Sequence, residues 1–438
     1  MNLATFIGGT HPYDGKELSK DRPVKVVLPK GELVYSMSQH LGAPAKPIVA
    51  KGDRVLVGQR IAEASAFISA HICSSVSGTV KSIEPRLLPG GNMCQAIIVE
   101  NDGLYEAVEG FGEKRDYTKL SKEEIRAIVK DAGIVGMGGA GFPNHVKITP
   151  KDDNAIDYVL VNAAECEPYL TSDYRMLLEQ PEKLIGGLKI LLQLFDKAQG
   201  VIGIEDNKMD AIELLTKMTE NEPRIKVQAL KTKYPQGAER ALIYACTGGR
   251  EVHSAILPAD MGCVVDNVDT VISIYNAVAE NIPLIRRIVT ITGDCVKTPQ
   301  NFEVRTGTNY AELVEEAGGL IKEPEKIISG GPMMGKALFD INVPVTKTSS
   351  AMLFLSHDDV AAMEPTACIR CGRCVNACPS HLVPQIMIEY AERNDIEGFK
   401  RVGGMECYEC GSCTYVCPAK RRLTQAFAYA RAEGRKRK

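Results

Sequence analysis

Eight of the 14 cysteines stand in two runs near the C-terminal end that share one spacing. The runs are CIRCGRCVNACP at 368–379 and CYECGSCTYVCP at 407–418, each of the form C-x2-C-x2-C-x3-C-P. Thiolates at this spacing bind iron–sulfur clusters, which pass electrons one at a time. Three closely spaced cysteines hold one cubane, and the cysteine before the proline typically ligates the other cluster. We therefore predict two [4Fe–4S] clusters with crossed ligands.

The predicted ligands of the first cluster are Cys368, Cys371, Cys374 and Cys417, and those of the second are Cys407, Cys410, Cys413 and Cys378. Zinc is the alternative, because it also accepts four thiolates. A duplicated pattern with a proline after each fourth cysteine favours iron–sulfur clusters. Between the runs, residues 382–400 carry apolar side chains among charged ones and predict a helix with a break.

A second stretch whose residues could bind a ligand is SKEEIRAIVKDAGIVGMGGAGFPNHVKI at 121–148. Ser121 and Glu124 have the spacing of a capping box, which predicts that a helix starts here. Four glycines follow the helix, at positions 136, 138, 139 and 141. Crowded glycines let backbone N–H groups approach a phosphate or a flat ring closely. A generic tight turn is the alternative interpretation.

Three further segments repeat a strand–turn–helix pattern downstream. They are NAAECEPYLTSDYRML at 162–177, YPQGAERAL at 234–242 and VVDNVDTV at 264–271. The first places amide and acidic side chains in one short turn, which is unfavourable unless they meet ligand hydroxyls or ring nitrogens. A solvated loop is the alternative for its glutamates.

These four segments, in this order over about residues 120–280, resemble the flavin-binding subunit of respiratory complex I. Loops of that family carry G-x-G-G-x-G-F-P, N-A-x-E-x-E-P, Y-x-x-G-x-E and N-V-x-T. The resemblance implies FMN as a cofactor and NAD(H) as a substrate. No flavin-attaching motif is present, so we expect the FMN to be non-covalent.

The residues that the resemblance places on FMN are Gly136, Gly138, Gly139, Gly141, Lys147, Asn162, Glu165, Tyr234, Gly237, Asn267 and Thr270, with Lys147 near the phosphate. Glu167 and Glu239 would lie where the nicotinamide approaches the flavin and are the candidate catalytic residues. Three positions depart from the family. Ala164 replaces its usual acidic residue, Cys166 replaces a common serine, and Leu257 stands where an aromatic residue stacks on adenine.

The elements around these segments suggest further modules. In residues 24–105, a G-D-x-V-x-x-G-Q segment followed by S-G-T-V is typical of a lipoyl-like barrel-sandwich. The region of its hairpin apex, SAFISAHI, has no lysine to modify, so we interpret it as an interaction module and not a carrier. Residues 284–355 alternate strands with one helix and resemble the β-grasp domain called SLBB.

Composition limits the function classes. A formal net charge of −3 argues against a dedicated nucleic-acid binder. No apolar run is long enough to span a bilayer, and the start lacks the pattern of a signal peptide. Fourteen cysteines without such a signal suit a reducing cytoplasm.

Residues 420–438 carry eight basic residues and one acidic one. They predict a solvated, frayed helix, with docking on a membrane or an acidic partner as the alternative.

The whole arrangement, beginning with GGTHPYDGKELS, resembles the NADH-binding C subunits of Rnf complexes, the membrane-bound ferredoxin:NAD+ oxidoreductases that couple electron transfer to ion translocation. The implied fold is multidomain α/β and α+β: a barrel-sandwich hybrid, a complex I flavoprotein-like α/β FMN domain, a β-grasp (SLBB) domain and a helical two-cluster ferredoxin domain. We expect these domains at 1–110, 118–282, 283–356 and 360–420, with a basic tail at 421–438.

The resemblance implies a peripheral subunit on the cytoplasmic side of the cell membrane. Its partners would be other subunits of the complex, including an iron–sulfur subunit that meets ferredoxin. A hydride from NADH carries two electrons and each cluster accepts one, so FMN, which handles both, would sit between them. Two alternatives stay open: a flavin and iron–sulfur cobalamin reductase, and a non-catalytic electron-relay scaffold.

Overall fold

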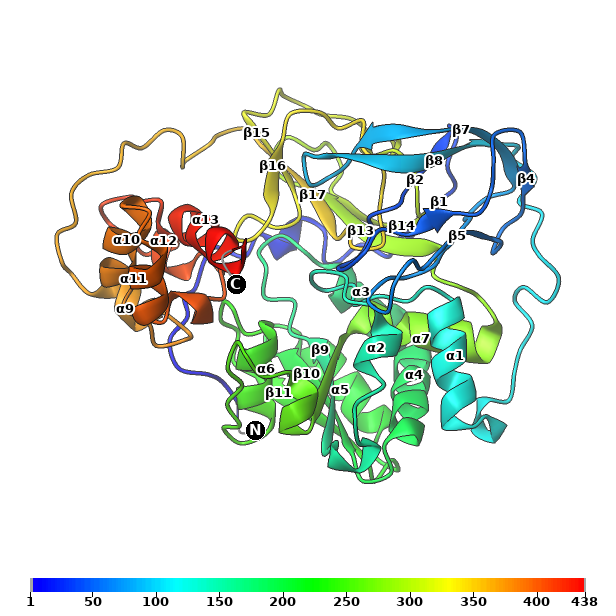
Figure 1. Cartoon of the computed structure of the whole chain (residues 1–438), viewed down its shortest axis with the longest axis horizontal. Coiled ribbons are helices and arrows are strands. Elements are labelled where there is room, and N and C mark those ends of the chain that lie inside the picture. Colours follow the sequence, from blue (N-terminus) through cyan, green and yellow to red (C-terminus); the bar gives the residue numbers. More distant parts are fainter. Residues whose placement is uncertain (1–2, 437–438) are drawn as a thin grey trace.

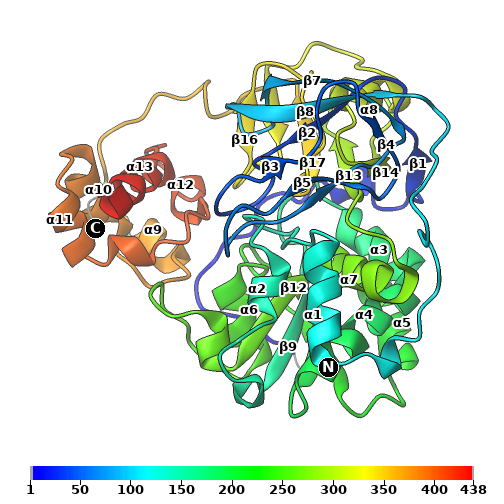
Figure 2. The same cartoon turned by 45° about the vertical axis from the view of Figure 1, so that its right-hand side comes forward.

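A computed structural model describes residues 3–436 of the chain. Two β-rich modules lie side by side above an α/β module, and a small helical module stands apart at one side (Figures 1 and 2). The multidomain fold expected from the sequence is therefore confirmed. In the part of the chain that the structure describes, no helix is long and apolar enough to cross a membrane.

The barrel-sandwich consists of two small sheets that face each other. One has the order β2-β8-β7-β4 and the other β3-β5-β6. Leu33, Tyr35, Val55, Ile61 and Ile97 meet between the sheets and are buried. The strands are β2 (Leu33–Ser36), β3 (Lys46–Pro47), β4 (Arg54–Val55), β5 (Arg60–Glu63), β6 (Ile72–Cys73), β7 (Gly78–Leu87) and β8 (Met93–Asn101).

The α/β module has a parallel four-stranded sheet in the order β11-β10-β9-β12. Its strands are β9 (Tyr158–Ala163), β10 (Gln199–Glu205), β11 (Ile225–Leu230) and β12 (Cys263–Asn267). Val159, Leu160 and Val161 are consecutive and fully buried, because helices cover both faces of the sheet. The helix α6 packs on one face, and α1, α3, α4, α5 and α7 pack on the other.

The helices of this module are α1 (Lys122–Asp131), α2 (Asn144–Lys147), α3 (Ser172–Glu179), α4 (Pro181–Leu194), α5 (Met209–Met218), α6 (Glu239–Cys246) and α7 (Val268–Glu280). Short 3-10 helices are η2 (Tyr117–Lys119), η3 (Asp153–Ala155) and η4 (Pro258–Met261). The predicted capping box of α1 is confirmed: Ser121 Oγ accepts from the Glu124 N–H, and the Glu124 carboxylate accepts from the Ser121 N–H.

The β-grasp module is a six-stranded sheet in the order β1-β14-β13-β17-β15-β16. Its elements are β13 (Arg286–Thr292), β14 (Gln300–Arg305), α8 (Tyr310–Glu316), β15 (Lys326–Ser329), β16 (Lys336–Leu338) and β17 (Ala351–Leu355). The edge strand β1 (Lys25–Val27) comes from the N-terminal end of the chain and pairs in parallel with β14.

The N-terminal segment, residues 3–27, lies outside the barrel. Ala4 forms a bridge with Leu230, and Thr10 forms one with Tyr234, both in the α/β module. The segment then passes through η1 (Lys16–Leu18) to β1. In Figure 1 it is the blue trace that runs from the α/β module, past the helical module, to the β-rich modules. It therefore connects the α/β module to the β-grasp module.

The helical module contains α9 (Arg373–Ala377), α10 (Pro384–Glu392), α11 (Ile396–Arg401), η5 (Gly404–Glu406), α12 (Ser412–Tyr415) and α13 (Leu423–Lys436). The predicted break between the cysteine runs is confirmed. It separates α10 from α11, and the Asp395 carboxylate caps α11 by accepting from the Gly398 N–H. Helix α13 differs from the solvated tail that we expected. Its Phe427 and Ala430 are buried, with the Phe427 ring 5.9 Å from that of Phe399.

Candidate functional site

The sheet of the α/β module reverses its strand order between β9 and β12. From β9 the chain continues to β10, which pairs with one edge of β9, whereas β12 pairs with the other edge of β9. Ligands of open α/β sheets bind in the crevice at the carboxyl ends of the strands at such a point. Asn162 and Asn267 stand near or at these ends and are direct partners in the β9–β12 register. Two predicted flavin-binding residues therefore meet at the place where the fold favours a ligand.

The glycine loop lies over this crevice. The Met137 N–H donates to Thr270 Oγ1 at 3.0 Å, which ties the loop to the start of α7. A Cβ added at Gly138 would lie 2.9 Å from Asn267 Cβ, whereas one at Gly139 would meet nothing within 4 Å. Both glycines are exposed. The loop thus approaches Asn267 closely at Gly138, and its backbone at Gly139 has free space around it.

Gly141 fixes the other end of the loop to the β-rich modules. Its φ of +72° is a left-handed conformation, which glycine adopts without strain. A Cβ there would lie 2.7 Å from Thr348 Cγ2. The Gly141 carbonyl accepts from the Leu41 N–H of the barrel module at 3.0 Å. Three modules therefore define the shape of this loop.

Lys147 stands at the end of α2 under the glycine loop. Its ammonium donates to the Val265 carbonyl at 2.6 Å and lies 3.4 Å from Asp266 Oδ1. A Cβ added at Gly136 would be 3.7 Å from the Lys147 Nζ atom. Burial raises the pKa of Asp266, and Asp266 Oδ2 has no hydrogen-bond partner among the described residues. Lys147 therefore lies beside the glycine loop with a buried carboxyl as its partner, and its place near the FMN phosphate stays a prediction.

The third predicted segment packs directly against the first turn. Asn162 Nδ2 donates to the Gly237 carbonyl at 2.8 Å, and the Gly237 N–H donates to Cys166 Sγ at 3.2 Å. Any side chain at Gly237 would start about 3.3 to 3.4 Å from Cys166, Ala164 and Asn162. Gln236 is fully buried, yet neither its amide nitrogen nor its amide oxygen has a partner among the described residues.

These observations test whether the site fits FMN. Gly138 and Gly237 form a cradle that side chains would fill, and unpaired polar atoms of Gln236 and Asp266 stand in the predicted segments. Buried polar groups without partners are unfavourable, and a polar ligand can supply partners. The residues present therefore fit a flat, polar ring system with a phosphate.

Sequence reasoning missed Asp173 in this site. Glu165 Oε1 accepts from the Asp173 N–H at 2.7 Å, and Asp173 Oδ2 accepts from Asn267 Nδ2 at 2.6 Å. Burial, with Glu165 next to it, raises the pKa of Asp173 to about 8. Burial also raises the pKa of Glu165. The only signal for Asp173 was its place at the first turn of the helix after the acidic segment, 11 positions beyond Asn162.

The two candidate catalytic glutamates have different surroundings. The Glu167 carboxylate accepts from the backbone N–H groups of Met333 (3.2 Å) and Met334 (2.8 Å) in the β-grasp module. Burial raises its pKa to about 7. Glu239 is exposed at the first residue of α6. No hydrogen bond joins the two side chains within residues 3–436, and their shared role stays a prediction.

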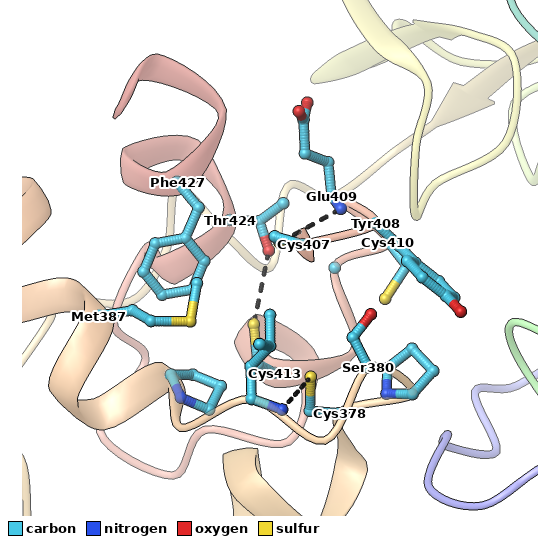
Figure 3. Close-up of a pocket in the computed structure, with 14 residues that line it drawn as sticks. Cys378, Ser380, Met387, Cys407, Tyr408, Glu409, Cys410, Cys413, Thr424 and Phe427 are labelled. Carbon is cyan, nitrogen blue, oxygen red and sulfur yellow. Dashed lines mark hydrogen bonds between the residues drawn. The ribbon is translucent and has the colours of Figure 1, made fainter. Parts of the chain in front are cut away.

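Three cysteines of the second run and Cys378 line one cavity (Figure 3). Cys378, Cys407, Cys410 and Cys413 are among the residues that line it, together with Phe427 and Met387. Backbone N–H groups of Leu382 and Glu409 donate to the sulfurs of Cys378 (3.4 Å) and Cys407 (3.3 Å). Such N–H···S contacts tune cluster potentials. The four cysteines predicted as ligands of the second cluster thus line one cavity, and their ligand role stays a prediction.

The first run lies at the surface of the helical module. Cys368 and Cys371 are exposed, and Cys374 and Cys417 are partly buried. Burial raises the pKa of the Cys374 thiol, and the charges of Cys417 and Cys368 raise it further. The predicted ligands of the first cluster therefore include two exposed cysteines.

The buried cavity lies where the modules meet. Tyr234 Oη donates to the Cys410 carbonyl at 2.6 Å, which joins the α/β module to the second run. A Cβ at Gly411 would lie 3.1 Å from the Met333 carbonyl, in the loop that also binds Glu167. Arg240 pairs with Glu406 at 2.9 Å across the same boundary. This cavity therefore borders the module that carries the predicted flavin site.

Comparison with known families agrees with these four modules. Residues 4–104 match the RnfC barrel sandwich hybrid domain, residues 129–276 the Nuo51 FMN-binding domain, residues 288–337 the SLBB domain and residues 352–422 a 4Fe-4S dicluster domain. The chain thus carries an FMN-binding domain and a domain for two [4Fe–4S] clusters. The positions of individual ligands are not part of these matches.

Several curated proteins are similar over most of the chain. The C subunit of the proton-translocating ferredoxin:NAD(+) oxidoreductase complex of Clostridium ljungdahlii is 46% identical over 435 residues, 99% of this chain and 94% of that protein. The C subunit of the Na(+)-translocating ferredoxin:NAD(+) oxidoreductase complex of Acetobacterium woodii is 43% identical over 438 residues, 99% of this chain and 98% of that protein. A solved NAD+-reducing [NiFe]-hydrogenase in the air-oxidized state shares the fold, with a TM-score of 0.53 and 17% identity over 74% of this chain and 67% of that one.

Proposed function

This chain belongs to the family of C subunits of ion-translocating ferredoxin:NAD+ oxidoreductase complexes, and we propose that it moves electrons between NAD(H) and its iron–sulfur clusters through FMN. It is part of an oxidoreductase. When bound, FMN exchanges an electron pair with a nicotinamide and single electrons with clusters. The observation that carries the proposal is the hydrogen bond from Tyr234 Oη to the Cys410 carbonyl, which joins the flavin segment to a cluster-ligand run.

The residues of the crevice have separate tasks in this proposal. Gly136, Gly138, Gly139, Gly141 and Lys147 would hold the phosphate side of FMN. The remaining FMN-binding residues would hold its ring and ribityl chain, and these are Asn162, Glu165, Tyr234, Gly237, Asn267 and Thr270. Glu167 and Glu239 would orient the nicotinamide. The raised pKa of Glu167 supports a role for its charge, because the carboxyl titrates near neutral pH.

The two clusters would act in a set order. The buried cavity of Cys378, Cys407, Cys410 and Cys413 borders the flavin module, so its cluster would exchange electrons with FMN. The other cluster, at the exposed Cys368 and Cys371, would exchange electrons with a partner outside the chain. Exposed cysteines occur in only one of the two predicted ligand sets, which supports this order because an internal relay needs no access to solvent.

The partner would be another component of a membrane-bound complex. The relatives are named as subunits of ion-translocating complexes. We propose that this chain docks peripherally on the cytoplasmic side of the membrane, and that a separate iron–sulfur subunit meets ferredoxin. The translocated ion would cross other subunits.

Anaerobic purification tests this function directly. The protein should release one flavin with a single phosphate on acid precipitation and contain about eight iron atoms, four for each cluster. It should reduce an artificial dye with NADH, which a non-catalytic scaffold would not do. Glu167→Gln should keep the flavin yet slow this reaction or weaken NADH binding. Flavin retained in the protein pellet, or an inactive wild type with full cofactor content, would contradict the proposal.

A further inference from the structure

Residues 14–19 of the N-terminal segment cover the turn that carries the acidic site residues. The Tyr169 N–H donates to the Asp14 carbonyl, and Ser19 Oγ lies 2.7 Å from Thr171 Oγ1. Gly15, at a φ of +57°, packs so closely on the Tyr169 ring that a Cβ would lie 2.5 Å from it. This part of the segment is therefore fixed to residues 167–171, more than 150 positions away in the sequence.

Lys16 extends from this segment into the interior beneath the turn. Only 6% of the residue is exposed. Its ammonium donates to the carbonyls of Glu167 (3.0 Å) and Leu170, and lies 4.0 Å from Glu165 Oε2. An ammonium is rarely buried without a function or a close carboxylate partner, because desolvation disfavours its charge. Lys16 has two carbonyls and one distant carboxylate instead.

A second buried lysine stands next to this group but has partners of its own. Lys208 donates to the Ala164 carbonyl at 2.8 Å and to Asn207 Oδ1 at 2.9 Å, and lies 3.7 Å from Glu205. Lys16, Lys20 and Lys208 line one cavity with Tyr174 and Asn207. Glu165 meanwhile accepts backbone N–H groups at the start of α3. Of these two buried lysines, Lys16 therefore has the more distant carboxylate, at 4.0 Å against 3.7 Å for Lys208.

We propose that Lys16 is a positioning residue of the flavin site, which holds the 165–170 turn in place and sets a positive charge beside the bound ring. This deepens the proposed function and rests on it, because Glu165 is the neighbour that would meet FMN. Reduction adds negative charge to the ring, and a nearby cation in a buried, poorly solvated site favours the reduced form. The N-terminal segment would thereby help to set the potential at which NAD(H) and the clusters exchange electrons.

The test is an anaerobic redox titration that follows flavin absorbance in the full-length protein. Lys16→Met should shift the flavin equilibrium toward the oxidised form by about tenfold, which is about 30 mV for a two-electron couple. Lys16→Arg keeps the charge and should stay near the wild type. Lys20→Met is the matched control, because Lys20 lines the same cavity but is only partly buried, and its titration should be unchanged.

Lys16→Met with a full complement of flavin and an unchanged titration would overturn the proposal, because a purely structural lysine does not alter the potential. If Lys16→Met loses its flavin, the same redox titration of Glu165→Gln tests the proposal. Removal of the neighbouring negative charge should shift the equilibrium the opposite way, and a shift in the same direction or none would also overturn it. Absence of FMN from the wild type would reject both this inference and the proposed function, whereas an unchanged titration rejects this inference alone.

Discussion

At the scale of single residues, close approach between neighbouring segments limits which side chains fit in the candidate site. Asn162 and Asn267 face each other across β9 and β12, and the glycines beside them leave room for a ligand. Gly138 approaches Asn267 and Gly237 approaches Cys166. The chain thus has short side chains where the proposed ring would come close, and amides where it could form hydrogen bonds.

Gly138→Val tests this arrangement. The β-branched side chain would start 2.9 Å from Asn267 Cβ and then extend into the crevice. We expect loss of most of the bound flavin and of NADH-dependent dye reduction, with iron content unchanged because the cysteines belong to another module. Flavin and iron analysis of the same preparation measures both. Full flavin in this variant would contradict the assignment of the loop.

Lys347 is another buried lysine, and its charge should make the stability of the protein depend on pH. It comes from the β-grasp module, is 1% exposed, and donates to the carbonyls of Gly133 (2.6 Å) and His71 in the two other large modules. Burial lowers its pKa from 10.5 to about 8. The folded protein therefore loses this proton at lower pH than the unfolded chain. Its contribution to stability is full above about pH 10.5 and is lost as the pH falls through 8.

Lys347→Met removes that dependence. Between pH 8 and 10.5 the unfolding free energy of the wild type should rise relative to the variant, by at most about 3 kcal/mol. Loss of the two carbonyl contacts destabilises the variant equally at each pH. It therefore cancels when the gap between the two proteins at one pH is compared with the gap at another. Chemical denaturation of both proteins at about pH 7.5 and about pH 10 measures the change in the gap between them. A constant gap would show that Lys347 keeps an ordinary pKa.

At the scale of elements, the helical module shows an internal repeat. Arg370 and Glu409 stand two positions after the first cysteine of each run, and both have a positive φ, 56° and 58°. Each donates its N–H to that cysteine's sulfur, at 3.4 and 3.3 Å. Gly372 and Gly411 also match, with φ of 75° and 84°. The repeat extends from the spacing of the cysteines to the conformation of the backbone around them.

Cys378→Ser tests the crossed ligands. Cys378 follows the first run in sequence but lines the cavity of the second. We expect the variant to damage the cluster of Cys407, Cys410 and Cys413 and to spare the other. Cys417→Ser is the matched control, because it should do the reverse. Electron paramagnetic resonance of the reduced proteins distinguishes the two clusters, and the opposite pattern would show uncrossed ligation.

At the scale of the whole molecule, the N-terminal segment holds the helical module against the α/β module. The Gly9 N–H donates to the Ala377 carbonyl at 3.0 Å, and Thr10 exchanges two hydrogen bonds with Tyr234. Gly8, at a φ of +88°, approaches Cys378, whose carbonyl would lie 2.8 Å from an added Cβ. This segment thus contacts both a predicted flavin-binding segment and a predicted cluster ligand. Its position should govern the distance between the two cofactors.

Gly8→Ala should therefore slow electron transfer within the chain. The clusters should be reduced more slowly by NADH, whereas NADH-dependent reduction of a dye that takes electrons from the flavin should persist. Gly52→Ala is a matched control: Gly52 also has a positive φ, +94°, but nothing lies within 4 Å of its added Cβ. Stopped-flow absorbance follows flavin and clusters separately. Equal cluster reduction rates in the two variants would mean that the segment does not set this distance.

Features that depend on neighbouring residues could be predicted from the amino-acid sequence. The cysteine spacing, the capping box at Ser121 and the break before Asp395 are local, because a few adjacent positions contain all the atoms involved. The glycine and acidic segments, in their order, likewise carried the family resemblance that implied an α/β flavin fold. These features needed no knowledge of how distant parts of the chain meet.

The way in which distant segments combine emerged from the tertiary structure alone. It joined residues 3–27 to the α/β, β-grasp and helical modules, brought Lys16 beneath the turn at Glu165, and placed α13 in the core of the helical module. It also set Asp173 against Asn267. No local pattern encodes such contacts, because they form between segments that are separate in the sequence and depend on which surfaces the packed modules leave facing each other.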